Sequence, residues 1–113
     1  MDPINIPNTP RWGTLDVDSN GNLFIGGVNL DTGRIWCVRS TNAKNGAIVP
    51  TFDQSTAVNL GGDIVVGEPI NPEGLVGQIF LTVDRSGTST NNNVYMLASV
   101  QPTGSTTGSD VMF

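Results

Sequence analysis

One short stretch of the chain places oxygen-bearing side chains at alternating positions, namely Asp16, Asp18, Asn20 and Asn22. Calcium loops present their oxygen ligands in this alternating way. An EF-hand loop counted from Asp16 would need an acidic twelfth residue, and the chain has Gly27 there. The pattern leaves open a calcium site with Asp16, Asp18 and Asn20 as ligands. It favours the alternative, in which these Asp and Asn residues build a tight turn without metal.

Other residues that could do chemistry are scarce. Histidine is absent, which removes the commonest general base and the usual metal ligand. Cys37 is the only cysteine and lies in the apolar run 35–38, which predicts a buried, unreactive thiol and excludes an intrachain disulfide. Glu68 and Glu73 are paired carboxylates of a kind that can cleave glycosidic bonds. They fall in a predicted loop, where carboxylates are usually solvated, and no role is predicted for them.

Charge and hydropathy exclude several partners. Five basic and ten acidic residues give a net charge of −5, and Lys44 is the only lysine. Nucleic acids and anionic membranes need a basic face, so neither is expected to bind this chain. No basic segment followed by an apolar one opens the chain, and no apolar stretch is long enough for a bilayer. We therefore predict neither a signal peptide nor a membrane span.

The elements that must position these residues are predicted to be strands. Only 13% of the 113 residues are charged, while Gly, Thr, Ser and Asn are abundant, which is typical of an all-β protein. After a Pro-rich lead-in over 1–12, alternation and turn residues predict strands at 14–18, 23–28, 34–40, 57–60, 78–84, 94–100 and from 110 onward. In the first of these, Leu15 and Val17 share one face, and Thr14, Asp16 and Asp18 share the other. The connector 61–77, with Pro69 and Pro72, is predicted to resemble the lead-in.

The chain contains one structural unit nearly twice. The segment 13–21 recurs in outline as 79–87 at an offset of 66, and 22–25 recurs as 93–96 at an offset of 71. The segment 35–37 then recurs as 111–113 at an offset of 76. Repeats of strand–turn–strand content usually belong to units that stack on their neighbours to bury their faces.

The strands at 23–28 and 94–99 carry apolar residues on both faces, which indicates sheets that are covered on both sides. A sandwich buries one face of each sheet, whereas a propeller blade is packed on either side. We therefore predict antiparallel four-stranded meander blades of a β-propeller. The first blade spans about 13–60 and is complete, and the second spans about 78–113 and is incomplete.

Two segments resemble a known family. Arg39-Ser40-Thr41-Asn42, followed by Gly46 and Thr51-Phe52, resembles an Asp-box, with Asn42 where the family has Asp and Phe52 where it has Trp. The segment 12–24 resembles the first hairpin of a blade in sialidase-like (BNR-repeat) β-propellers. The resemblance implies a ring of six or seven blades, completed either by the rest of a larger protein or by self-assembly as a homo-oligomer. It also implies an extracellular or cell-surface location.

The same resemblance frames the function. We expect a non-catalytic structural or ligand-recognition segment, for which Trp12 and Arg11 are the candidate contacts to a carbohydrate. Packing between blades is the favoured alternative for Trp12. A sialidase-like glycoside hydrolase fragment is a second reading, for which the chain offers Arg11, Arg34, Arg39, Arg85 and Tyr95. Tyr95 is expected to pack rather than to react. A calcium-stabilised carbohydrate-binding module is a third reading.

Overall fold

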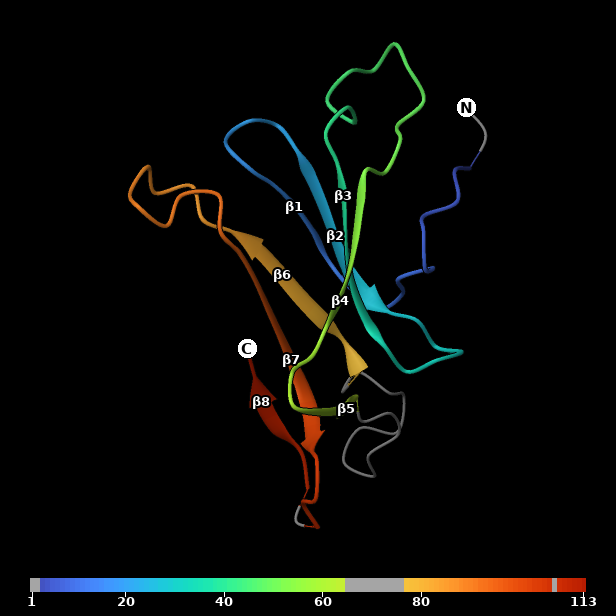
Figure 1. The fold of residues 1–113 in the computed structure, drawn as a ribbon, viewed down its shortest axis with the longest axis vertical. Helices are drawn as coiled ribbons and strands as arrows, with labels where there is room; N and C mark the ends of the chain where they lie inside the picture. The colour runs from blue at the N-terminus through green and yellow to red at the C-terminus, as the bar shows by residue number, and fades with distance from the viewer. Residues whose placement is uncertain (1–2, 65–76, 107) are drawn as a thin grey trace.

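The fold is all-β. A computed structural model describes residues 3–64, 77–106 and 108–113, and within these ranges the regular elements are strands, with no helix (Figure 1). Sheet A has the order β1-β2-β3-β4, and sheet B has β7 at its centre. The strands are β1 (Leu15–Val17), β2 (Leu23–Val28), β3 (Ile35–Ser40), β4 (Gln54–Val58), β5 (Gly62–Ile64), β6 (Ile79–Val83), β7 (Val94–Pro102) and β8 (Asp110–Met112).

Sheet A is the predicted antiparallel meander, and the described strands differ from the predicted ones at the fourth strand and in the connector. The fourth strand is Gln54–Val58 and begins three residues before the predicted 57–60, because Arg39 and Gln54 already pair across the loop. The connector also begins with β5, a strand that was not predicted, and Asp63 of β5 pairs with Gln101. The predicted lead-in-like character of the connector rests on Pro69 and Pro72, which lie outside the described residues.

Sheet B has β5 and β6 along one edge of β7 and β8 along the other. Ala98 pairs with Ile79 of β6 and with Met112 of β8, so these strands lie on opposite edges. Val100 likewise pairs with Ile64 of β5 and with Asp110 of β8. Because a strand has only two edges, β5 and β6 share the edge that β8 does not use.

The register of the strands confirms the repeat. Leu15 pairs with Ile25 in sheet A, and the offsets of 66 and 71 turn this pair into Leu81 and Met96, which are paired in sheet B. The offsets of 71 and 76 also map the β2–β3 register onto β7–β8, since Val28 and Ile35 become Ser99 and Val111, which are paired. The two units are therefore copies of one strand pattern.

A one-residue bulge sets the direction in which β1 faces. Arg11 bridges to Val28, but Leu15 pairs with Ile25, so the β1 side has one more residue than β2 between these contacts. The extra residue is Trp12, whose backbone has a φ of 53°. A bulge shifts the alternation of a strand by one position and so exchanges its two faces. As a result Leu15 is 63% exposed, and the face that carries Asp16 points toward sheet B.

The two sheets share one hydrophobic core. Most of it comes from the inner face of sheet B, which is formed by Ile79, Leu81, Val83, Met96, Ala98 and Val100. The inner face of sheet A contributes Ile35, with Phe24, Cys37 and Val58 packed against the cluster. Gly26 lets the sheets approach, since a Cβ there would lie 2.9 Å from Cε of Met96. β6 lies against β1 and β2.

The two sheets are stacked so that their equivalent faces point in the same direction. Under the repeat offsets, Leu81 and Met96 on the inner face of sheet B correspond to Leu15 and Ile25 on the outer face of sheet A. The inner face of sheet A therefore contacts the inner face of sheet B, and under the repeat that face of sheet B corresponds to the outer face of sheet A. The arrangement is head-to-tail, as in a row of repeated units.

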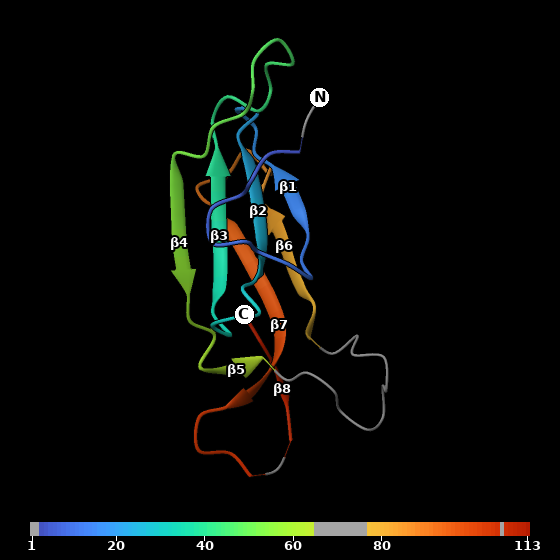
Figure 2. The ribbon, with the colours of Figure 1, turned by 90° about the vertical axis from the view of Figure 1, so that its right-hand side faces the viewer.

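The N-terminal segment crosses the outer face of sheet A (Figure 2). Asn8 donates from Nδ2 to Oγ of Ser55 on β4 at 2.6 Å, and Asn29 donates to the carbonyl of Asn8 at 2.9 Å. Val38, in the middle of this face, is fully buried. The outer face of sheet A is therefore covered in part by the N-terminal segment and not by a further blade, and Leu15 and Val17 on this face are exposed.

Candidate functional site

The seam between β1 and β6 joins the two units through hydrogen bonds. The N–H groups of Ile79, Leu81 and Val83 point away from β7 and are bound by three acceptors from the first unit. These acceptors are the carbonyl of Trp12 at 2.8 Å, Oγ1 of Thr14 at 2.7 Å and Oδ2 of Asp16 at 2.9 Å. Alternate residues of one strand thus satisfy alternate N–H groups of the other, and the edge of β6 is closed.

Asp16 is the most heavily bonded carboxylate of this seam. Besides Val83, its Oδ1 accepts from Nη1 of Arg85 at 2.7 Å and from the N–H of Val17 at 2.8 Å. Arg85 also donates to the carbonyl of Val17 at 2.6 Å. The N–H of Val83, then the Arg85 guanidinium and the N–H of Val17, hold the pKa of Asp16 far below its usual range.

Asp18 organises the turn that follows β1. Its Oδ1 accepts from the N–H groups of Asn20 and Asn22 at 2.9 and 2.8 Å, and its Oδ2 accepts from Nδ2 of Asn22 at 2.8 Å. Burial acts to raise the pKa of Asp18, but the donors, led by Asn22, outweigh it, and the pKa is lowered. Asp84, the repeat equivalent, accepts from Thr90 and Ser86 in the same role.

The predicted calcium ligands therefore bind protein donors in separate groups. Asp16 faces β6, Asp18 faces its own turn, and the carbonyl of Asn20 accepts from Nζ of Lys44 at 2.7 Å. Within the described ranges, no group of three or more His, Cys, Asp or Glu residues could hold a metal ion. The turn-forming role of Asp18 is observed directly, and a calcium site at these residues stays a prediction.

The candidate carbohydrate contacts lie at the bulge. Arg11 uses its N–H and carbonyl to bridge Val28, each at 2.8 Å. Trp12 is 44% exposed, and its ring lies beside Gly77, where an added Cβ would come within 3.2 Å of Cε3. The indole thus contacts the segment that leads into β6, in keeping with the packing alternative. A sugar-binding role for Trp12 and Arg11 stays a prediction.

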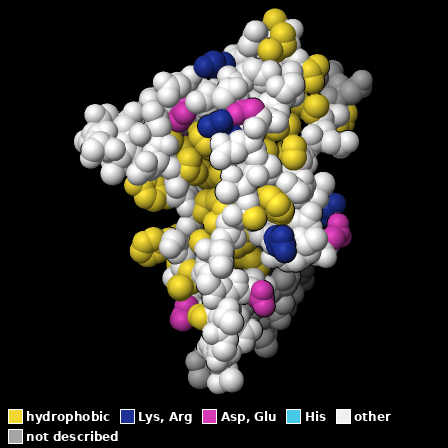
Figure 3. Space-filling model, viewed as in Figure 1, with side chains coloured by type: hydrophobic (Ala, Val, Ile, Leu, Met, Phe, Trp, Pro, Cys, Tyr) yellow, Lys and Arg dark blue, Asp and Glu magenta, His cyan; other side chains and the backbone are white. Residues whose placement is uncertain are grey.

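The arginines proposed for a hydrolase are placed apart. Arg39 forms an ion pair with Asp53 through Nε at 3.0 Å and Nη2 at 2.5 Å, which lowers the pKa of Asp53. Arg85 pairs with Asp16, and Arg34 lines a separate hollow beside Asp63. Figure 3 shows basic side chains in several separate places. Glu68 and Glu73 lie outside the described residues.

The Asp-box-like segment forms the loop between β3 and β4. Asn42 braces this loop by accepting at Oδ1 from the N–H of Thr51 at 2.9 Å and donating from Nδ2 to Oγ1 of Thr51 at 3.0 Å. Ser40 donates to Oδ1 of Asn42 at 3.0 Å. The amide thus connects the two ends of the loop, as a structural residue would.

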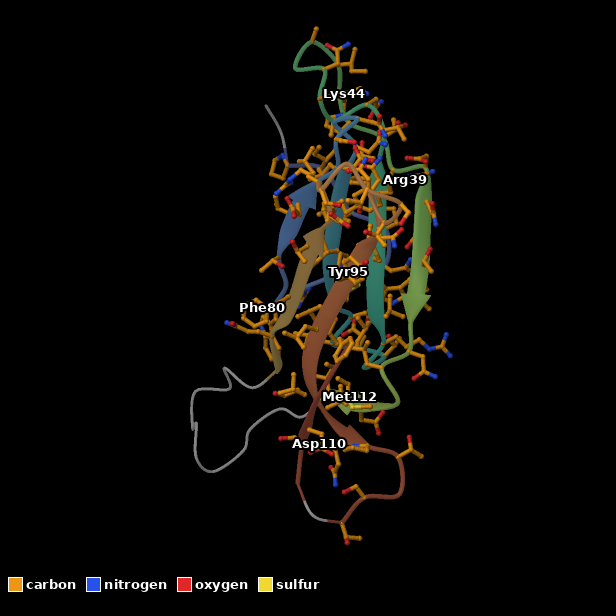
Figure 4. All side chains as sticks on the ribbon, turned by 90° about the vertical axis from the view of Figure 1, so that its left-hand side faces the viewer. Arg39, Lys44, Phe80, Tyr95, Asp110 and Met112 are labelled. Carbon is orange, nitrogen blue, oxygen red and sulfur yellow. The ribbon has the colours of Figure 1, made fainter. Side chains whose placement is uncertain are left out.

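The sequence predicted apolar residues on both faces of 94–99, but it did not reveal that Tyr95 and Leu97 share one outer face of sheet B with other apolar side chains. This outer face is formed by Phe80, Tyr95, Leu97, Val111 and Phe113. These side chains are all exposed, Phe80 by 53% and Phe113 by 94%. Most of them line a hollow of about 450 Å³ on this face. Figure 4 looks onto sheet B with Phe80 and Tyr95 labelled. Tyr95, which was expected to pack, is 46% exposed, and its hydroxyl accepts from Nδ2 of Asn93 at 3.4 Å. The repeat offset of 71 makes it the counterpart of Phe24.

Cys37 lies half-buried in a groove between the sheets, and burial raises the pKa of its thiol, as an unreactive cysteine requires.

Comparison with protein-family models, with curated proteins and with solved structures finds no match to this chain. Across the described ranges, the structure contains no helix that is long and apolar enough to cross a membrane.

Proposed function

We propose that this chain is a non-catalytic structural segment of a sialidase-like β-propeller. Its two sheets act as successive blades, and a further sheet packs on the outer face of sheet B. This further sheet comes from a second copy or from the remaining blades of a larger propeller. The observation that carries the proposal is the equivalence between the outer face of sheet B and the inner face of sheet A.

This equivalence is residue by residue. Phe24 of sheet A corresponds to Tyr95 of sheet B, since each occupies the same place in its hairpin register. Ile35 corresponds to Val111 in the same way. In sheet A these positions pack against the next sheet and form part of the core. The same positions in sheet B are exposed.

The energetics support a covered face. Fully burying a large apolar side chain is worth about 1.5–3 kcal/mol, and five such side chains lie together here. Contiguous exposed apolar patches on soluble proteins commonly mark interaction sites. The N-terminal segment lies over part of the outer face of sheet A, where Leu15 and Val17 are exposed, whereas five large apolar side chains are exposed on the outer face of sheet B.

We propose a non-catalytic role because of how the side chains that could react are arranged. The sequence has no histidine, and the carboxylates of Asp16 and Asp18 each accept several hydrogen bonds from protein donors. Arg39 and Arg85 are each held by a different carboxylate. These groups stabilise loops and the seam.

The molar mass in solution tests the proposal. Light scattering at rising concentration is expected to give a mass above the 11.9 kDa of one chain. Val111→Asp is expected to weaken this association about tenfold or more, since it places a charge in the apolar contact. Val49→Asp is the matched control, because Val49 is 62% exposed and Val111 is 63% exposed, and Val49 lies in a loop.

Two results would overturn the proposal. One is a folded wild-type chain that stays at the mass of one copy at every concentration, which would overturn a second copy as the source of the further sheet. The other is an association that Val49→Asp weakens as much as Val111→Asp does.

A further inference from the structure

The dipeptide Asn-Gly occurs twice in the chain, as Asn20-Gly21 and as Asn45-Gly46. Asparagine is chemically labile, and a glycine after it leaves the next backbone nitrogen unshielded, because glycine carries no Cβ. That nitrogen can attack the side-chain amide of the asparagine and form a cyclic imide. Both asparagines are exposed, so sequence and exposure do not distinguish the two sites. Their hydrogen bonds do distinguish them.

Gly21 is held by the turn after β1. Its N–H donates to the carbonyl of Asp18 at 3.0 Å, and its φ is 80°. The carbonyl of Asn20 accepts from Nζ of Lys44 at 2.7 Å, and an added Cβ at Gly21 would lie 3.0 Å from Cδ of Lys44. Attack by the nitrogen of Gly21 would break its hydrogen bond and disturb this packed turn.

Gly46 lies at the tip of the loop between β3 and β4 and is unrestrained within the described chain. No described residue accepts a hydrogen bond from its N–H, and an added Cβ there meets nothing within 4 Å. The neighbouring residues hold the tip, since Asn45 donates to the carbonyl of Asn42 at 3.0 Å and Ile48 donates to that of Asn45 at 3.3 Å. The attacking nitrogen is therefore free in a loop that needs no hydrogen bond from it.

The side-chain amide of Asn45 is turned toward the same stretch of backbone. Its Oδ1 accepts from the N–H of Ala47 at 3.0 Å, so the amide is folded back along the chain beside Gly46. Holding two reacting groups of one chain near each other raises the rate of ring closure. A donor on the carbonyl oxygen also stabilises the negative charge that this oxygen gains during the attack.

We propose that Asn45 is a self-modifying residue, which converts to aspartate and isoaspartate with water as the co-reactant. The nitrogen of Gly46 bonds to Cγ of Asn45, and Nδ2 leaves as ammonia, taking up the proton that the Gly46 N–H loses. Water then opens the cyclic imide. Cleavage between the nitrogen and Cγ gives aspartate, whereas cleavage between the nitrogen and the main-chain carbonyl carbon of residue 45 gives isoaspartate. No oxidant or reductant takes part.

The modification changes the loop tip and leaves the sheets in place. Each product adds one carboxylate to a chain whose net charge is −5, and isoaspartate also lengthens the main chain by a methylene group. Below the tip, Asn42 and Thr51 hold the loop together through two hydrogen bonds. The inference does not depend on the proposed function, because it uses neither face of sheet B.

The probe is hydroxylamine, which attacks the cyclic imide and cuts the chain there. In the folded chain, mass spectrometry is expected to show the cut after residue 45 forming about fivefold or more faster than the cut after residue 20. In denaturant the hydrogen bonds that restrain Gly21 are lost, so the two cuts are expected to form within about twofold of one another. Peptide mapping after incubation in buffer alone should show residue 45 converting before residue 20.

Gly46→Ala is the variant that assigns the fast reaction. The new Cβ meets nothing within 4 Å, so the fold is kept, but it shields the nitrogen, and the cut after residue 45 is expected to slow about tenfold. The cut after residue 20 is expected to stay unchanged. Equal rates at the two sites in the folded chain, a rate ratio that unfolding leaves unchanged, or continued fast cutting in Gly46→Ala would overturn the proposal.

Discussion

At the scale of single residues, Asp16 connects the two sheets. One carboxylate accepts from the backbone of β6, from the guanidinium of Arg85 and from its own strand. Hydrogen bonds to a charged group are worth about 1.5–3 kcal/mol each, more than those between neutral groups. The residue that the sequence suggested as a metal ligand is thus occupied in holding the units together.

Asp16→Asn should lower the free energy of unfolding at pH 7 by about 1–3 kcal/mol. The amide can accept from Val83 but cannot accept at its nitrogen from Arg85. The folded pKa of Asp16 lies below the unfolded value of about 3.9. The stabilisation is therefore present above about pH 4 and is lost as the pH falls through the folded pKa. Denaturant titrations from pH 7 to 2 should show the two proteins converging in stability.

Asp31→Asn is the control for this comparison, since Asp31 is an exposed residue in the β2–β3 turn. It is expected to change stability by less than about 0.5 kcal/mol. A stability difference between wild type and Asp16→Asn that stays constant down to pH 2 would contradict the role given to the carboxylate.

At the scale of elements, the bulge at Trp12 decides how β1 is used. Without it, Leu15 would pair with Phe24 and point into the core, and Asp16 would point outward. The bulge needs Gly13, because a Cβ there would lie 1.7 Å from the carbonyl oxygen of Gly26. The carbonyl belongs to the backbone of β2 and cannot move aside without disturbing the sheet.

Gly13→Ala is therefore expected to destabilise the protein by about 2–4 kcal/mol, or to prevent folding. Gly46→Ala is the matched control, since an added Cβ there meets nothing within 4 Å. Thermal unfolding followed by circular dichroism measures both. Equal melting temperatures for the two variants would show that β1 does not approach β2 in this way.

The positions of most strands in sheet A could be predicted from the sequence. Alternation and the Asn-Gly turn placed β1, β2 and β3 within a residue or two, because local patterns determine hairpins. The inward direction of Thr14 and Asp16 could not be predicted, since the usual rule points Leu15 and Val17 to the core. The bulge that reverses the faces rests on a Trp with positive φ, a conformation that no local propensity favours.

At the scale of the whole molecule, two copies of one strand pattern are stacked head-to-tail. The offsets read from the sequence map the registers of β1–β2 and β2–β3 onto those of β6–β7 and β7–β8, although the registers themselves came from the structure. They did not predict which faces meet, because periodicity gives the two sides of a strand and not its neighbour.

The stacking of the two units is tested most directly by amide hydrogen exchange along β6. Phe80 and Thr82 bond to β7, whereas Ile79, Leu81 and Val83 point to the outer edge and depend on acceptors from the first unit. If the units are stacked as described, all five amides are protected to within about tenfold of one another. Rapid exchange at Ile79, Leu81 and Val83, as at an open sheet edge, beside slow exchange at Phe80 and Thr82 would contradict the stacking.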